Sequence, residues 1–182
     1  MCKGCVKAKA KAKSVKSETS EKADKPRECL FVDSSGPCAK SLGNDWHWGK
    51  TVDNFSGMSW DDFVKNKNDF PGLMDNRCAA MKNLGHNIKH VHCDNAGENS
   101  TALQCACAKH GIELERAAPN VPQFNGCIER GFVIDEQGGS AMMFSADSKE
   151  GVRNSLWPHA AQTKSSLHNV ACNARLEEND AP

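Results

Sequence analysis

Residues 29–37 read C-L-F-V-D-S-S-G-P, a short apolar run that ends in an acid and then in a glycine–proline pair. An apolar run of this length between turn signals is typical of a buried strand, and Gly36-Pro37 marks its end. The pattern therefore predicts a strand whose last inward-facing residue is Asp33. A second strand candidate, Asn87–Cys93, is likewise closed by an acid, Asp94.

Between these two strands the chain carries a hairpin signal and a helix signal. Tryptophan, valine and phenylalanine around Gly57 predict a hairpin over Trp46–Phe55 and Met58–Val64. Loose helical periodicity that stops at Gly85 predicts a helix over Asn68–Leu84.

The second half of the chain is expected to hold a helix, a strand, a loop and two further helices. The ranges are, in chain order, Ser100–His110, Ile112–Arg116, Ala118–Gly126, a helix restarting near Asn125, and Asn154–Asn173. Gly138-Gly139 should interrupt the helix that restarts near Asn125, at roughly 1 kcal/mol per glycine relative to alanine. Pro158 should fall in the tolerant first turn of the last helix. Strands and helices in this order predict a mixed α/β domain.

Length and charge divide the chain into a body and two tails. The 182 residues suffice for one domain with a proper core. Residues 1–28 are rich in lysine and low in complexity, which predicts a disordered basic tail. Up to Arg27 there are nine Lys/Arg against three Asp/Glu, and the rest carries fourteen against twenty. We expect a core over 29–175 and an acidic tail over 176–182. The basic arm is either a solvated leader or a segment that neutralises nucleic-acid phosphates.

Membrane and secretion signals are missing from the sequence. No run approaches the ~20 apolar residues of a membrane helix, and the Lys-rich N-terminus lacks the apolar segment of a secretory signal. We therefore expect a protein of the nucleus or cytoplasm that is neither secreted nor held in a membrane. Its ten cysteines should be reduced thiols.

Three acids stand where a metal site can be built. Asp33 and Asp94 close strands, and Glu129 follows a Pro/Asn/Gly loop on a presumptive helix. Hard divalent cations such as Mg²⁺ prefer carboxylate oxygens, and a two-metal site needs acids that converge from different elements. The chain has 23 acids, however, and a strand-ending aspartate is more often a turn residue or a helix cap. Position alone leaves both interpretations open.

The sequence around each acid narrows the choice. Asp33 lies in F-V-D-S-S-G-P, Asp94 in C-D-N-A-G-E-N, and Glu129 in P-Q-F-N-G-C-I-E-R. These blocks resemble the integrase of copia-type LTR retrotransposons, whose corresponding segments read D-x-x-G-P, R-x-D-N-G-G-E and P-Q-Q-N-G-x-x-E-R. Further matches follow in family order: V-D-N-F-S at 52–56 with Trp60, Phe63, Lys65 and Lys67, then H-G-I-E-L-E at 110–115, and L-W-P-H-A-A at 156–161.

The resemblance implies an RNase H-like fold, with a mixed five-stranded sheet flanked by helices. It also implies a polynucleotidyl transferase that trims the 3′ ends of element DNA and joins them to target DNA. The three acids would hold two Mg²⁺ or Mn²⁺ ions, with Asp33 contacting both and with Asp94 and Glu129 completing one site each. Active integrases of this type work as homo-oligomers, so we expect the same here.

Residues near Glu129 are implied as nucleic-acid contacts: Gln123, Asn125 and Arg130. The chain departs from the family pattern at Gly131, where the family has a basic residue. Asp135-Glu136 also add negative charge to a helix face that in this family approaches DNA, and a negative surface opposes DNA binding.

Cysteine and histidine pairs suggest further ligands. Cys2 and Cys5 have the C-x-x-C spacing of zinc ligands and look like the last half of the zinc module that precedes retroelement integrase cores, without its histidines. His90 and His92 sit two apart on one strand face near Asp94, either as extra ligands or as exposed strand residues.

Three functions remain in view. The first is a DNA-integrating transferase with two metal ions. The second is a catalytically inactive, transposon-derived remnant that binds nucleic acid through its basic arm. The third is another RNase H-like nuclease, which would need the same acids but would cleave DNA without joining it. The order of the blocks, with P-Q-x-N-G directly before Glu129, favours integrase over the nuclease.

Overall fold

The structure, a computed structural model, describes residues 23–94, 100–116 and 126–179, with the last eight of these as backbone only. Its elements are β1 (Cys29–Ser35), β2 (His47–Asp53), β3 (Ser59–Val64), the 3-10 turn η1 (Lys67–Asp69), α2 (Phe70–Asn83), β4 (His90–Cys93), α3 (Ser100–Lys109), β5 (Glu113–Arg116), α4 (Gly126–Ser145) and α5 (Glu150–Asn179). The expected basic tail lies almost wholly outside the described residues.

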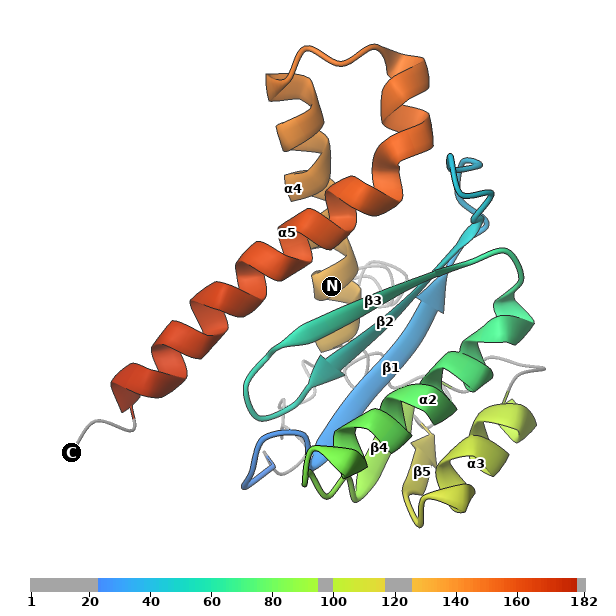
Figure 1. The fold of residues 1–182 in the computed structure, drawn as a ribbon, viewed down its shortest axis with the longest axis vertical. Coiled ribbons are helices and arrows are strands. Elements are labelled where there is room, and N and C mark those ends of the chain that lie inside the picture. The colour runs from blue at the N-terminus through green and yellow to red at the C-terminus, as the bar shows by residue number, and fades with distance from the viewer. Residues whose placement is uncertain (1–22, 95–99, 117–125, 180–182) are drawn as a thin grey trace, which may run out of the picture.

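The five strands form one sheet in the order β3-β2-β1-β4-β5 (Figure 1). Strands β1, β2 and β3 are antiparallel neighbours, whereas β4 and β5 run parallel to β1. The mixed five-stranded sheet implied by the resemblance is therefore confirmed. Strand β4 begins at His90, three residues later than the sequence predicts.

One face of the sheet packs against α2 and α3. Because side chains alternate along a strand, Leu30 and Val32 of β1 point to this face. They join a continuous apolar core with side chains from both helices, from β4 and from the residues just before β4 and β5: Phe70, Met74, Cys78, Met81, Ile88, Val91, Cys93, Leu103, Cys107 and Ile112. This core holds β1 and β4 side by side.

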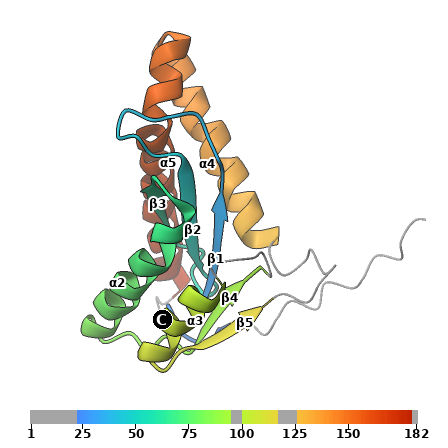
Figure 2. The ribbon, with the colours of Figure 1, turned by 90° about the vertical axis from the view of Figure 1, so that its right-hand side faces the viewer.

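The opposite face carries α4 and has a much smaller apolar cluster. Phe31 of β1 and Val52 of β2 pack there against Ile128 of α4, with Phe132 at the margin. Figures 1 and 2 show the α4–α5 pair extending past the end of the sheet, away from α2 and α3. Asp33, two residues after Phe31, lies on this same face.

A buried ion cluster joins α4 to the sheet next to these apolar residues. Lys50 of β2 donates hydrogen bonds to Asp61 of β3 (2.5 Å) and to Asp135 of α4 (2.6 Å). The Lys50 and Asp61 side chains are fully buried, and that of Asp135 is 4% exposed. Asp135 is thus an internal ion-pair partner and not part of an acidic DNA-facing surface, which corrects the expectation from sequence; Glu136 is exposed.

Two glycines of α4 allow close approaches. A Cβ atom on Gly131 would lie 3.1 Å from Lys50 Cδ, so the residue that replaces the family's basic side chain makes room for the buried lysine. A Cβ on Gly139 would lie 3.0 Å from the backbone carbonyl carbon of Ala160 in α5. Gly138-Gly139 do not interrupt α4, contrary to the prediction, because α5 packs directly against the helix at this point.

The last helix is longer than predicted. It begins at Glu150, four residues before the expected start, and continues to Asn179. Pro158 therefore lies inside the helix and not in its first turn. An internal proline removes one backbone hydrogen bond and bends a helix, and Figure 1 shows that α5 is bent. Within the described part of the chain, no helix is both long and apolar enough to cross a membrane.

Candidate active site

Asp33 and Asp94 are brought together by the pairing of two parallel strands. Val32 of β1 is in register with Cys93 of β4, and the two aspartates are the next residues along each chain. Parallel neighbours end at the same edge of a sheet. Since Val32 and Cys93 both point into the apolar core, the following residues face the opposite side, where α4 lies.

The first turn of α4 brings Glu129 near enough to Asp33 for its negative charge to affect the pKa of Asp33. Ile128 is fully buried against Phe31 and Val52, which sets the rotation of the helix over the sheet. Glu129 follows directly in the first turn and is exposed. The ion pair of Asp135 with Lys50, two turns further along the chain, also fixes the rotation of α4.

Asp33 responds electrostatically to both other acids. Burial raises the pKa of Asp33 to about 6, and the negative charges of Asp94 and Glu129 add to the rise. The Ser34 amide donates a hydrogen bond to Asp33 Oδ1 (2.7 Å) and opposes it. Three acids from β1, from the end of β4 and from α4 therefore share one electrostatic neighbourhood.

Lys67 is a further member of this neighbourhood. It begins η1, and its positive charge lowers the pKa of Asp33. Sequence reasoning placed Lys67 only in the matched F-x-K-x-K block and assigned it no role. The signal was therefore present, but only the fold shows that η1 lies beside the end of β1.

The donor set suits a hard divalent cation. Carboxylate oxygens that repel one another at a partly buried strand end are the ligands that Mg²⁺ and Mn²⁺ prefer. A cation held by Asp33, Asp94 and Glu129 would remove the repulsion that raises the pKa of Asp33. The three side chains are therefore of the chemical type that the implied metal prefers, but among the described residues their carboxylate oxygens do not form a group lying within 4.8 Å of one another.

The other predicted contact residues divide into two groups. Arg130 is described, exposed and next to Glu129 on α4. Gln123, Asn125, Cys2 and Cys5 lie outside the described residues. His90 and His92 both contact Glu115 of β5, and the His92 side chain is only 12% exposed.

A cavity of about 550 Å³ lies between α4, α5 and the start of the β1–β2 connection. Trp48, Phe132 and Trp157 line it together with Glu136 and Arg153, but none of the three acids does.

The comparisons with known proteins agree with this architecture. No family model matches the chain. In sequence it is 28% identical over 146 residues to the retrovirus-related Pol polyprotein from transposon TNT 1-94 of Nicotiana tabacum, covering 78% of this chain and 11% of the polyprotein. In structure it matches a chain of the simian T-cell lymphotropic virus intasome in complex with PP2A regulatory subunit B56 gamma. The TM-score is 0.56 at 20% identity, over 76% of this chain and 48% of that one.

Sequence and fold similarity together support a retrotransposon integrase-like domain. The chain spans about a tenth of the length of the tobacco transposon polyprotein. It spans about half of the matched intasome chain.

Proposed function

We propose that this chain is the catalytic core of a DNA-integrating polynucleotidyl transferase, with Asp33, Asp94 and Glu129 as the ligands of two Mg²⁺ or Mn²⁺ ions. The observation that carries the proposal is the convergence of these acids, two of which raise the pKa of the third. The copia-like sequence around each acid supports the same assignment.

The acids act by binding and orienting and not as covalent nucleophiles. Bound metal ions would activate the attacking oxygen and stabilise the leaving oxygen of a phosphodiester. Asp33 is held by its position at the end of β1 and by the Ser34 amide. Glu129 is held by the packing of Ile128 and by the Lys50–Asp135 ion pair. Fixed ligands of this kind supply positioning and charge neutralisation before the reaction begins.

The proposed substrate is DNA, as both element ends and target. Exposed Arg130 beside Glu129 offers a guanidinium for a phosphate, and the same role is proposed for Gln123, Asn125 and the Lys-rich residues 1–28. Since the structural relative belongs to an intasome, we include a homo-oligomer in the proposal.

Strand-transfer and disintegration assays with the full chain in Mg²⁺ and in Mn²⁺ test the proposal. Asp94→Asn and Glu129→Gln should reduce product to the level of a reaction without protein. Glu150→Gln is the matched control for Glu129→Gln, because Glu150 is likewise an exposed glutamate in the first turn of a helix. Equal product from wild type and Asp94→Asn in both metals would contradict the catalytic role.

The charge asymmetry of the chain favours one alternative, a non-catalytic remnant that binds nucleic acid through its basic arm. It predicts DNA binding that weakens steeply with salt, survives Asp94→Asn and is lost when residues 1–27 are removed. Cleavage without joining would instead identify an RNase H-like nuclease. The assays above separate all three.

A further inference from the structure

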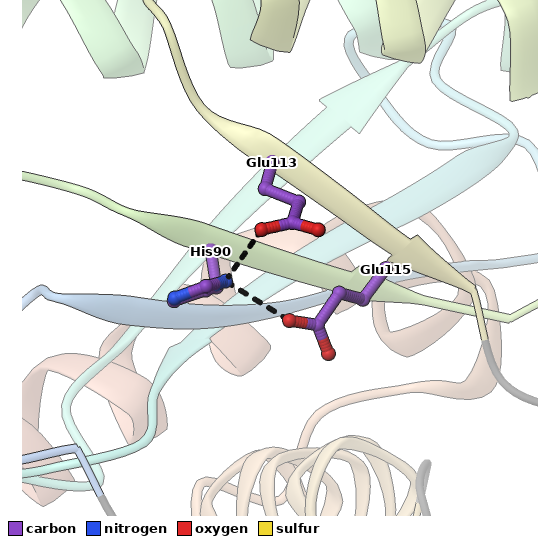
Figure 3. Close-up of side chains that lie close together, drawn as sticks. All are labelled: His90, Glu113 and Glu115. Atoms are coloured by element: carbon purple, nitrogen blue, oxygen red, sulfur yellow. Dashed lines mark ion pairs between the residues drawn. The ribbon is translucent and has the colours of Figure 1, made fainter.

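Four side chains that sequence reasoning did not group lie on one face of the β4–β5 pair. The strands are parallel, with His90 in register with Glu113 and His92 with Glu115. Figure 3 shows the His90 ring of β4 pointing at the carboxylates of Glu113 and Glu115 on β5. The cluster exists only because these strands pair, since its acids lie more than twenty positions from its histidines in the sequence.

The spacing of the polar atoms suits a small metal ion. His90 Nδ1 lies 2.9 Å from Glu115 Oε1 and 3.6 Å from Glu113 Oε2, and the three groups offer ligand atoms that all lie within 4.8 Å of one another. In tetrahedral zinc sites the bonds to nitrogen and oxygen are ~2.0 Å, which separates neighbouring ligand atoms by roughly 3.3 Å. The two His90 distances lie on either side of this value.

The negative charges of Glu113 and Glu115 and the lone pair of His90 Nδ1 could all be satisfied by a bound cation. The described residues place no lysine or arginine in an ion pair with Glu113 or Glu115. His90 Nδ1 is shielded from solvent, yet its contacts do not have the geometry of a hydrogen bond. One proton on His90 would offset only one of two facing carboxylates, whereas a divalent cation offsets both and uses the lone pair of His90 Nδ1.

His92 contacts Glu115 and helps to orient its carboxylate. Its Nδ1 lies 3.2 Å from Glu115 Oε2, the oxygen that does not face His90 most closely. Its ring stacks on Phe31 with 5.1 Å between centroids. Partners of this kind orient a ligating carboxylate and are part of most metal sites in proteins.

We propose that His90 Nδ1, Glu113 and Glu115 form a Zn²⁺ site, with a further coordination position open to water and His92 orienting Glu115. Imidazole with carboxylates suits Zn²⁺, whereas the all-carboxylate set of Asp33, Asp94 and Glu129 suits Mg²⁺. His90 precedes Asp94 by four positions, so the two sites lie roughly 13 Å apart along β4. The zinc ion would clamp the edge strand β5 to β4 and is independent of the proposed DNA chemistry.

Metal titration of the metal-free full chain tests this site. The protein carries Cys2→Ser and Cys5→Ser, which removes the competing C-x-x-C pair. Zn²⁺ at about 100 times its dissociation constant should raise the melting temperature by roughly 5–10 °C. Co²⁺ in its place should give visible absorption of a nitrogen- and oxygen-ligated ion without near-ultraviolet thiolate bands.

Variants locate the bound ion. His90→Ala and Glu115→Gln should abolish the thermal shift and the Co²⁺ spectrum, while the matched controls His159→Ala and Glu136→Gln keep both. Glu113→Gln should weaken binding at least about tenfold; its side chain is 70% exposed, so the fold remains intact in this variant. Asp94→Asn should bind Zn²⁺ normally, which separates this site from the proposed catalytic one.

Two results would overturn the proposal. One is unchanged Zn²⁺ affinity in His90→Ala, Glu113→Gln and Glu115→Gln, which would place the ion elsewhere. The other is the absence of a thermal shift in the parent protein at millimolar Zn²⁺, which would leave the cluster as a set of ordinary histidine–glutamate ion pairs.

Discussion

The two faces of the sheet differ in composition and in the residues that they hold in place. The face under α2 and α3 is a continuous apolar core that includes Leu30, Val32 and Met74. The face under α4 has a smaller apolar cluster of Phe31, Val52 and Ile128, a set of aromatic rings around buried Trp48, and the buried ion cluster at Lys50. Along β1 the two faces alternate residue by residue, so one strand supplies both a core residue and a proposed ligand at its end.

The difference shows how a helix can be held on a sheet by a few specific contacts, among them a buried ion cluster. The apolar face is stabilised by area removed from water, and no single contact decides its geometry. On the face under α4, the position of that helix depends on Ile128, on the contact of Phe132 with Trp48, and on one buried lysine between two aspartates. The proposed site should therefore be sensitive to a few residues, whereas the apolar face should lose stability without losing the site.

The largest effect on stability is expected for Lys50→Met. The substitution leaves Asp61 and Asp135 buried without their cation, and breaking a buried ion pair costs about 3–5 kcal/mol. Urea unfolding measures the loss, and Mg²⁺ affinity should fall as well because α4 carries Glu129. Adding Asp135→Asn to Lys50→Met should recover part of the stability. A loss below about 1 kcal/mol would contradict the structural role of the lysine.

On the apolar face, Met74→Ala should cost about 2–5 kcal/mol, since a fully buried side chain is replaced by a cavity. The same urea experiment measures it. Unlike Lys50→Met, this variant should keep the Mg²⁺ affinity of the wild type under conditions where both are folded. A parallel loss of Mg²⁺ affinity would show that the two faces are not separable.

Unlike the two destabilising substitutions, Asp33→Asn should increase the free energy of unfolding of the metal-free protein at pH 7, by on the order of 1–3 kcal/mol. The pKa of Asp33 is raised to about 6, above its value in an unfolded chain, so the folded state binds the proton more tightly. Wild-type stability should therefore rise as pH falls from 7 through 6 towards 4, and this contribution should vanish in Asp33→Asn. Thermal unfolding in chelator across this range measures it, and identical pH profiles would contradict the assignment.

The same pKa sets the pH dependence of metal binding. Protons compete with the metal for Asp33, so Mg²⁺ affinity should fall by up to about tenfold per pH unit below about 6. Calorimetric titration between pH 5 and pH 8 measures this fall. An affinity that stays constant down to pH 5 would place the metal away from Asp33.

The smallest effects are expected for two adjacent glycines of α4. Gly139→Ala would bring a methyl group against the α5 backbone at Ala160 and should destabilise by about 1–2 kcal/mol. Gly138→Ala meets no backbone but the Lys164 side chain from Cγ to Cε. Once this flexible side chain has rotated away, the substitution should stabilise by up to about 1 kcal/mol through helix propensity. Differential scanning calorimetry of both variants gives the two signs, and equal signs would contradict the packing of α4 on α5.

Much of the fold could be predicted from local signals. The hairpin, α2, α3 and β5 lie within a few residues of their predicted ranges, because strand alternation and glycine stops act over short distances. The errors occurred where tertiary contacts override propensity. Gly138-Gly139 remain helical because α5 packs on them, and Pro158 is accommodated within a bent α5.

The sequence by itself determined which residues are available: an acid after each of two apolar strands, a third at a helix start, and the copia-like blocks around them. The tertiary structure decided that these acids lie near one another. The parallel pairing of β1 with β4 aligns Asp33 with Asp94. The packing of Ile128 on the sheet adds Glu129, so that both other acids affect the pKa of Asp33. The same holds for the burial of Asp135 on Lys50 and for the His90 cluster. Neither has a local sequence signature, since their partners lie on different elements and come together only when the chain folds.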